Sequence, residues 1–219
     1  MIIAIDGPAG SGKSTTAKIA AEKLGFIHIN TGAMYRGIAL KCIKGNINPA
    51  HSSELEPILN QTTFKFAGKD GVDLFMDGVN ISSKITSVEV TESVSRISAI
   101  PLVRKKLVKY QREMADGIDV VLEGRDIGTA VFPDADYKFF LVADIHERAK
   151  RRMEEMEANG EIVSLAELTE ELKERDRKDS TREYSPLKKA EDAIEIDTTS
   201  LSIQQQVNRI VEIVTKSIK

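Results

Sequence analysis

The sequence is poor in residues on which secreted proteins and many metal enzymes depend. Cys42 is the only cysteine, so an internal disulfide is impossible and a reducing compartment is expected. Its surroundings have helical, partly apolar character, which favours packing over reactivity. His28, His51 and His146 lack the spacing of metal ligands, so we expect them in packing or at the surface. These absences disfavour disulfide scaffolds, thiol enzymes and histidine-based metal sites.

Long apolar runs and a strong charge of one sign are also missing. The apolar runs are far shorter than the roughly 20 residues of a membrane-spanning helix. The N-terminus enters an apolar strand at once, which leaves no room for a signal peptide. The net charge is −3 over 219 residues, so neither nucleic acid nor an anionic membrane surface is an expected partner. We expect a cytoplasmic, monomeric protein whose partners are small molecules.

The most informative stretch is the first 16 residues, MIIAIDGPAGSGKSTT. Residues 2–5 form an apolar run typical of a buried strand, a glycine-rich turn follows, and helical periodicity begins at Lys13. This is the motif G-x-x-x-x-G-K-[ST] between a strand and a helix. Its glycines let backbone N–H groups face a polyphosphate, and the helix N-terminus adds roughly half a positive charge. Lys13 would reach the β- and γ-phosphates and Ser14 would bind Mg²⁺, so we predict a protein that binds a nucleoside triphosphate.

Strands alternate with helices along the rest of the chain. Further core strands are predicted at 26–29, 118–122, 137–142 and 193–196. This alternation is typical of an α/β fold in which helices cover both faces of a parallel sheet. One region breaks the rhythm, because residues 64–67 and 72–76 alternate apolar and polar around a turn at 68–71, and Asp77-Gly78 adds a second turn. We interpret residues 62–83 as an inserted β lobe.

Helical periodicity and end signals predict the elements between these strands. Thr31 is a suitable N-cap for one helix, and Ser164 with Glu167 matches the capping box of another. Pro101 divides a long helical stretch in two. The expected helices, besides the one after Lys13 and a short one within 46–60, lie at 33–43, 87–114, 144–158, 164–177 and 202–218.

Polar residues stand where open α/β sheets bind ligands. Tyr35 and Arg36 follow the second strand and Arg125-Asp126 the third, and ligands gather at the carboxyl ends of parallel strands. Residues 173–189, KERDRKDSTREYSPLKK, contain seven basic and four acidic side chains and lose helical periodicity near 179–181. A mixed charge run is often a solvated helix face. The alternative interpretation is a mobile lid whose arginines close over a transferring phosphoryl group, and this is what we expect here.

Four segments in this order carry a resemblance: GPAGSGKST, NTGAMYR, LEGRDIGTAVFPDA, and RRM with KERDRKDSTRE. Together they resemble the bacterial cytidylate kinase family over essentially the whole chain. The resemblance implies one P-loop NTPase domain with three layers and a five-stranded parallel sheet. Its core would comprise about 1–35, 101–160 and 190–219. A monophosphate-binding lobe with the antiparallel β patch would span about 36–100, and an arginine-rich lid would span about 160–189. The implied reaction transfers the γ-phosphoryl group of ATP to CMP or dCMP with Mg²⁺.

Matching positions imply the site residues. The ATP phosphates would be held by Gly7, Pro8, Ala9, Gly10, Ser11, Gly12, Lys13, Ser14 and Thr15. The acceptor phosphate would be held by Arg36, Arg125 and Arg182. Cytosine would be read by Ser95, Arg104 and Asp126, the pentose would contact Arg175 and Asp179, and the pocket would be lined by Thr31 and Tyr35. The implied catalytic set is Lys13, Arg125, Arg175 and Arg182.

Chemistry supports a cytosine reader but leaves alternatives open. Cytosine offers an amine donor beside ring acceptors, so a carboxylate and an arginine can read it together, whereas uracil would set a carbonyl against Asp126. A kinase of the same fold acting on UMP, AMP or an alcohol is one alternative, and Asp126 would then serve an alcohol as a base. A P-loop switch protein is the other, although the sequence has no N/T-K-x-D guanine reader.

Overall fold

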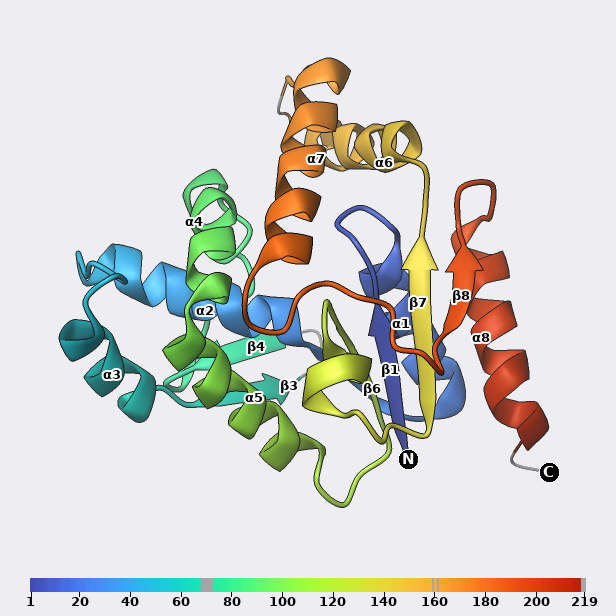
Figure 1. The fold of residues 1–219 in the computed structure, drawn as a ribbon, viewed down its shortest axis with the longest axis horizontal. Coiled ribbons are helices and arrows are strands. Elements are labelled where there is room, and N and C mark those ends of the chain that lie inside the picture. Colours follow the sequence, from blue (N-terminus) through green and yellow to red (C-terminus); the bar gives the residue numbers. More distant parts are fainter. Residues whose placement is uncertain (68–72, 159, 161, 218–219) are drawn as a thin grey trace.

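The computed structural model describes residues 1–67, 73–158, 160 and 162–217 of the chain. Its main sheet has five parallel strands in the order β2-β6-β1-β7-β8 (Figure 1). The bounds are β1 Ile2–Asp6, β2 Ile27–Asn30, β6 Val120–Gly124, β7 Tyr137–Val142 and β8 Ile194–Asp197. β1 lies between β6 and β7, and its last residue, Asp6, is paired with Gly124. The predicted α/β class and parallel sheet are confirmed.

Helices cover both faces of this sheet because its central strands are apolar on both sides. On one face, Ile3, Ile5 and Val121 pack against α1 (Lys13–Leu24) and α8 (Ile203–Ser217). On the other face, Ala4, Ile29, Val120 and Leu122 pack against the end of α5 (Pro101–Ala115) and a π-helical turn, η1 (Ile127–Val131). The sheet is therefore the middle of three layers.

A second apolar cluster lies beside the sheet. It combines α2 (Thr31–Lys44), α3 (Ser52–Gln61), α4 (Val88–Ala99) and α5 with the antiparallel strands β3 (Phe64–Ala67) and β4 (Asp73–Met76). The exposed strand β5 (Val79–Asn80) completes the three-stranded sheet beside β4. Asp77 and Gly78 both have positive φ, as a two-residue hairpin turn requires. The antiparallel β patch and the turn at Asp77-Gly78 are confirmed. The bounds of the insertion stay a prediction, and the turn expected at 68–71, with the residue that follows it, lies outside the described residues.

Two helix ends differ from the sequence-based expectation. Thr31 is not an N-cap: Asn30 is, since its side chain accepts a hydrogen bond from the Ala33 amide, and Thr31 is the first residue of α2. α7 (Leu165–Thr181) runs four residues beyond 177, so the expected loss of helix near 179–181 is wrong. The reason is tertiary: Asp179 is buried and accepts a hydrogen bond from Arg125. Ser164 is the N-cap of α7, but its side chain makes no capping hydrogen bond.

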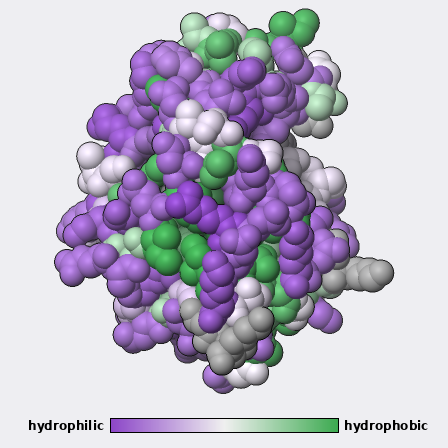
Figure 2. Space-filling view, turned by 90° about the vertical axis from the view of Figure 1, so that its right-hand side faces the viewer, coloured by the Kyte–Doolittle hydropathy of each residue, from purple (hydrophilic) through white to green (hydrophobic). Residues whose placement is uncertain are grey.

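No helix in the described ranges combines the length and apolar character that a bilayer crossing needs. The side of the molecule on which β8 and α8 lie is largely hydrophilic, with hydrophobic residues in small groups between charged ones (Figure 2). Cys42, the lone cysteine, is buried within α2, as expected for a packing role.

Candidate active site

The glycine-rich turn after β1 has the backbone that the motif predicts. Gly10 and Gly12 have left-handed φ values of 74° and 87°, which favour glycine. A Cβ atom on Gly7 would lie 2.2 Å from the carbonyl oxygen of Leu141 in β7, so the turn passes too close to the sheet for any side chain. The turn is thus wrapped tightly around the start of α1.

Lys13 lies across this turn. Its Nζ donates to the Pro8 carbonyl oxygen at 2.9 Å. Burial, with the nearby Arg125 guanidinium, lowers the pKa of Lys13 to about 7. Among the described residues no carboxylate forms an ion pair with this amine, and a phosphate in the turn would supply an anionic partner.

Glu123, at the end of β6, stands behind the first turn of α1. The Ser14 hydroxyl donates to its Oε2 at 2.6 Å, while the Thr31 hydroxyl donates to its backbone carbonyl. Burial alone would raise the pKa of this carboxyl, but the His28 imidazole, Lys13 and Ser14 together keep it below the ordinary value. Glu123 is therefore held as a carboxylate.

The Ser14–Glu123 pair fits the requirements of Mg²⁺. The described residues contain no group of three acidic, histidine or cysteine side chains placed to hold a metal ion. Mg²⁺ needs no such cage, because it keeps several waters and binds one or two protein oxygens together with substrate phosphates. Ser14 and Glu123 both line the cavity beside the glycine-rich turn, so the pair borders the space that a triphosphate and its metal would share. Ser14 and Glu123 could hold Mg²⁺ here.

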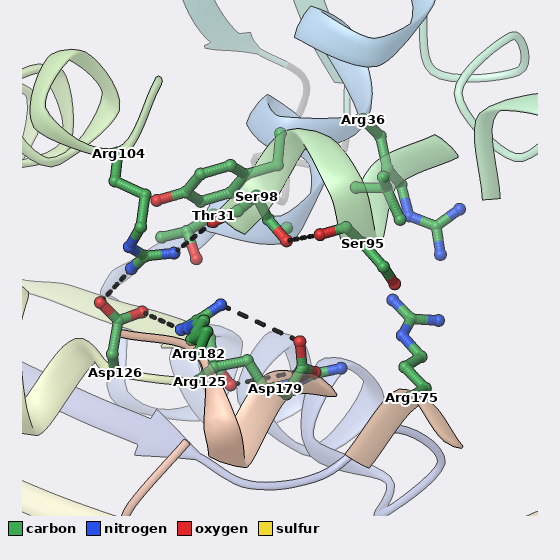
Figure 3. A pocket seen from close by; sticks show the side chains of 14 residues that line it. Thr31, Arg36, Ser95, Ser98, Arg104, Arg125, Asp126, Arg175, Asp179 and Arg182 are labelled. Carbon is green, nitrogen blue, oxygen red and sulfur yellow. Dashed lines mark hydrogen bonds and ion pairs between the residues drawn. The ribbon is translucent and has the colours of Figure 1, made fainter. Parts of the chain in front are cut away.

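One cavity lies beside the glycine-rich turn and is lined by Lys13, Ser14 and Glu123. A second cavity contains a buried ion pair (Figure 3). Arg104, on α5, donates to Oδ2 of Asp126, and each residue is only 4% exposed. The Arg104 guanidinium also donates to the Ser98 carbonyl at 3.1 Å and lies 5.4 Å from the centre of the Tyr35 ring. A carboxylate and a planar donor fork are thus fixed side by side at one end of the cavity.

Further guanidinium groups line the same cavity. Arg125 donates to Asp179 at 2.9 Å, and Arg182 lies 3.5 Å from Asp126 and 3.9 Å from Asp179. Arg175 has no hydrogen-bond partner at Nε among the described residues, and burial, followed by the Arg125 charge, lowers its pKa to about 10. Burial likewise lowers the pKa of Arg36. Cations outnumber the carboxylates facing them, which is the signature of a site for an anion.

The second cavity adjoins the cavity beside the glycine-rich turn. Gly32, Arg36, Gly124, Arg125 and Arg175 line both this cavity and the one beside the turn. A ligand anion in either cavity would therefore meet the same arginines.

The structure brings the expected site residues together. The cavity lining includes every residue that the resemblance implied for the acceptor: Thr31, Tyr35, Arg36, Ser95, Arg104, Arg125, Asp126, Arg175, Asp179 and Arg182. Among those implied for the triphosphate, the lining of the neighbouring cavity includes Ala9, Gly10, Gly12, Lys13, Ser14 and Thr15. Gly7, Pro8 and Ser11 do not line it; they shape the turn from behind, Ser11 being fully buried. Their roles in binding stay predictions.

Some residues of the site were not foreseen. Glu123 directly precedes Gly124-Arg125 at a strand end, so its position was a usable signal, but its contact with Ser14 joins residues 109 positions apart. Asp6 accepts hydrogen bonds from the Ile127 and Gly128 amides and so holds the backbone after Asp126. A third cavity lies on the other side of the turn, between Arg151 on α6 (Ile145–Ala158) and residues 199–203. Nothing in the sequence pattern singled out that cavity.

The α6–α7 pair is tied directly to the turn. Arg148, on α6, donates to the Ala9 carbonyl at 3.0 Å and to Asp176 on α7 at 2.6 Å. The helix that carries Arg175 and Asp179 is thereby held over the site (Figure 1). A movement of α7 would therefore change the contact that Arg148 makes with the turn.

Fold and site together define a P-loop α/β protein with a cation-rich second pocket. An uncharacterized protein of Eubacterium ventriosum shares the fold at a TM-score of 0.53 with 16% identity, the match covering 99% of this chain and 98% of that one. The family model for cytidylate kinase matches residues 3–216. The chain belongs to the cytidylate kinase family.

Individual relatives agree with that assignment. The cytidylate kinase of Caldicellulosiruptor bescii is 48% identical over 218 residues, covering 99% of this chain and 96% of the relative. That of Cytophaga hutchinsonii is 46% identical, covering 97% and 92%. The resemblance seen in the sequence is confirmed.

Proposed function

We propose that this protein transfers the γ-phosphoryl group of ATP to CMP or dCMP, giving ADP and CDP or dCDP. The observation that carries the proposal is the buried Arg104–Asp126 pair, in a cavity joined to the phosphate-binding turn by shared arginines. Family membership supports the same reaction.

The ion pair suits cytosine. The Asp126 carboxylate would accept from the exocyclic amine, while Arg104 would donate to the neighbouring ring acceptors. Uracil would bring a carbonyl against Asp126, and leaving a buried group unpaired costs about 1–3 kcal/mol, or roughly 5- to 150-fold in selectivity. This contrast favours CMP over the UMP alternative.

The arginines at the junction suit the phosphate of the acceptor. Arg36, Arg125 and Arg175 would hold it where the two cavities meet. The resemblance implied Arg182 for the phosphate and Arg175 for the pentose. Arg182 would have to leave Asp126 and Asp179 to reach the junction, so we exchange the two and assign Arg182 first to the base and pentose end. The acceptor phosphate has a second pKa near 6 and is largely a dianion at neutral pH. No general base is then needed, and the residues act by alignment and charge neutralisation.

The donor side uses the turn and the start of α1. Lys13 would exchange the Pro8 carbonyl for the β- and γ-phosphates, and Ser14 with Glu123 would hold Mg²⁺. The chemistry that Mg²⁺ would supply there is neutralisation of negative charge on the transferring phosphoryl group. The nucleoside of ATP would occupy the third cavity, against Arg151 and residues 199–203. Closure of α7 over the site would exclude water, which otherwise hydrolyses ATP.

We also propose the division into core, monophosphate-binding lobe and lid at the boundaries expected from the sequence. An apolar cluster around α2 to α4 supports a separate lobe, and it also includes α5, which this division places in the core. Another cluster joins α7 to Ala9 and α6 and supports a unit over the turn. The cytosolic location and monomeric state stay predictions.

An acceptor panel tests the function. ADP formation from ATP and Mg²⁺ is followed with CMP, dCMP, UMP, AMP and GMP supplied separately. We expect strong turnover with CMP and dCMP and weak turnover with the other three. Preference for UMP or AMP would overturn the acceptor assignment, and no activity with all five would overturn the reaction.

A further inference from the structure

His28 is a buried side chain for which the proposed reaction has no use. It lies on β2 with 6% of its surface exposed. Its Nε2 is 3.5 Å from Oε1 of Glu123. Neither atom has a hydrogen-bond partner within the described part of the chain, so two buried polar atoms face each other.

The strand register explains why they meet. His28 is paired with Val121, two positions before Glu123, and side chains two positions apart on a strand share a face. Val121 packs against Ala17, Ala20 and Ala21, so this is the face that α1 covers. The Glu123 carboxylate therefore lies between His28 on the sheet and Ser14 at the start of α1.

The hydrogen bond between Ser14 and Glu123 determines how the Ser14 oxygen can bind a cation. The Ser14 hydroxyl donates its hydrogen bond to Glu123 Oε2, at 2.6 Å. A hydroxyl has one proton and two lone pairs, so a serine that donates to a carboxylate keeps its lone pairs for a cation. The direction of the lone pairs then depends on how firmly the carboxylate is held, and one oxygen of that carboxylate faces His28.

We propose that His28 is a positioning residue for the metal, acting through Glu123 on Ser14. An Nε2–H donor fixes the carboxylate, which takes the Ser14 proton and so turns the Ser14 oxygen toward Mg²⁺. Groups behind the ligands orient a metal site in this way, and losing one typically costs about 10- to 100-fold in metal affinity. The inference rests on the proposed function only in taking Mg²⁺ and a nucleoside triphosphate as ligands; it does not depend on the acceptor.

Two substitutions of similar chemistry separate positioning from packing. The amide nitrogen of His28→Gln can reach the position of the imidazole Nε2, whereas the shorter side chain of His28→Asn cannot. The probe is the imido analogue of ATP, titrated calorimetrically with and without Mg²⁺ and in the absence of any acceptor. The quantity of interest is the ratio of the two affinities, which measures the contribution of the metal without catalysis.

We expect His28→Asn to lower this ratio by roughly tenfold or more, the usual size of such an effect. Affinity for the metal-free analogue should be unchanged, and His28→Gln should keep most of the wild-type ratio. His51→Asn, an exposed histidine at the start of α3, is the matched control and should leave the ratio unchanged. If His28→Asn does not fold, His28→Leu replaces it, since leucine fills similar space without a donor.

A folded His28→Asn or His28→Leu protein with the wild-type ratio would overturn the proposal. So would a His28→Gln protein that loses as much as the asparagine variant. With Glu123→Gln already present, the loss of His28 should cost nothing further, and an undiminished second loss would count against action through Glu123. Because no acceptor is used, these outcomes are independent of whether CMP is the substrate.

Discussion

Lys13 shows how one side chain can report on ligand binding. Burial and Arg125 lower its pKa to about 7 while it donates to the Pro8 carbonyl. At pH 7.5 the larger share of this amine is then neutral in the free protein, and a bound polyphosphate would restore its charge. Binding should therefore take up a fraction of a proton, about three-quarters for a pKa of about 7.

This proton uptake is measurable by calorimetry. The imido analogue of ATP with Mg²⁺ is titrated at pH 7.5 in buffers of different ionisation enthalpy. We expect the apparent enthalpy to vary with the buffer in the sense of uptake, and the variation to fall sharply in Lys13→Met. A wild-type enthalpy that does not depend on the buffer would contradict the assignment of Lys13.

Asp126 should determine acceptor selectivity rather than phosphate binding. Asp126→Asn keeps the shape of the side chain but offers an amine where cytosine needs an acceptor. We expect kcat/KM for CMP to fall much more than that for UMP, which reduces selectivity by about 5- to 150-fold, equivalent to about 1–3 kcal/mol. Asp134→Asn, an exposed change just after η1, is the control for lost charge and should leave selectivity intact. Equal losses for both acceptors would remove Asp126 from base reading.

For single residues, the sequence predicts those whose role follows from local chemistry. The motif led to Lys13 and Ser14, and the strand end led to Arg125 and Asp126. Thr31 was misassigned as a cap because Asn30 beside it is an equally good capping residue. Glu123 was passed over since its partners, Ser14 and His28, come from distant elements.

Among the elements, η1 is the one that local pattern could not reveal. Its Val131 amide bonds the Asp126 carbonyl and its Phe132 amide bonds the Ile127 carbonyl, both five residues back. The turn is held from outside by Asp6, whose two carboxylate oxygens accept the Ile127 and Gly128 amides at 2.8 and 2.7 Å. A tertiary contact from β1 thus determines where Asp126 stands.

Asp6→Asn should loosen that turn. The amide side chain can accept only one of the two backbone hydrogen bonds, so an amide is left unpaired at a cost of about 1–3 kcal/mol. We expect a loss of that size in the free energy of unfolding, measured in urea, together with reduced selectivity for CMP over UMP. Asp116→Asn, in the exposed segment before β6, should change neither. Unaltered selectivity in a destabilised protein would show that Asp6 does not position Asp126.

Gly7 should tolerate no side chain. Its added Cβ would lie 2.2 Å from the Leu141 carbonyl, so the turn or β7 must move, which costs on the order of 1–3 kcal/mol or more. Gly25→Ala is a matched comparison, because Gly25 has φ of 72° and no atom near its Cβ. That change should cost only the strain of the left-handed backbone, roughly 1–2 kcal/mol. Chemical unfolding of both variants compares them, and an equal loss would contradict the steric explanation.

In the whole molecule, three parts of the fold contribute residues to the site. The sheet supplies the turn and Asp126, the α2–α5 cluster supplies Arg36 and Arg104, and α7 supplies Arg175. Alternating strands and helices predicted the parallel sheet, but not its order, because β1 pairs with β6 more than 100 residues away. The length of α7 was likewise set by tertiary contacts, since Arg125 and Asp179 pair across 54 residues.

The tie between α7 and the turn should affect all acceptors alike. Asp176→Asn weakens the contact with Arg148, which also donates to the Ala9 carbonyl. We expect kcat/KM to fall about fivefold for CMP and UMP together, equivalent to about 1 kcal/mol. Glu170→Gln, whose partner is the exposed Lys173, is the control on the same helix. A change in selectivity would show that α7 acts on the base rather than on the donor side.

The central claim is that CMP lies in the second cavity with its base at the Arg104–Asp126 pair and its phosphate at the arginines of the junction. A crystal structure with CMP and the imido analogue of ATP tests it most directly. We predict the cytosine amine within hydrogen-bond distance of Asp126, and the CMP phosphate between Arg36, Arg125 and Arg175, facing the γ-phosphate. A cytosine ring bound away from Asp126, or a CMP phosphate that does not face the γ-phosphate, would contradict the account.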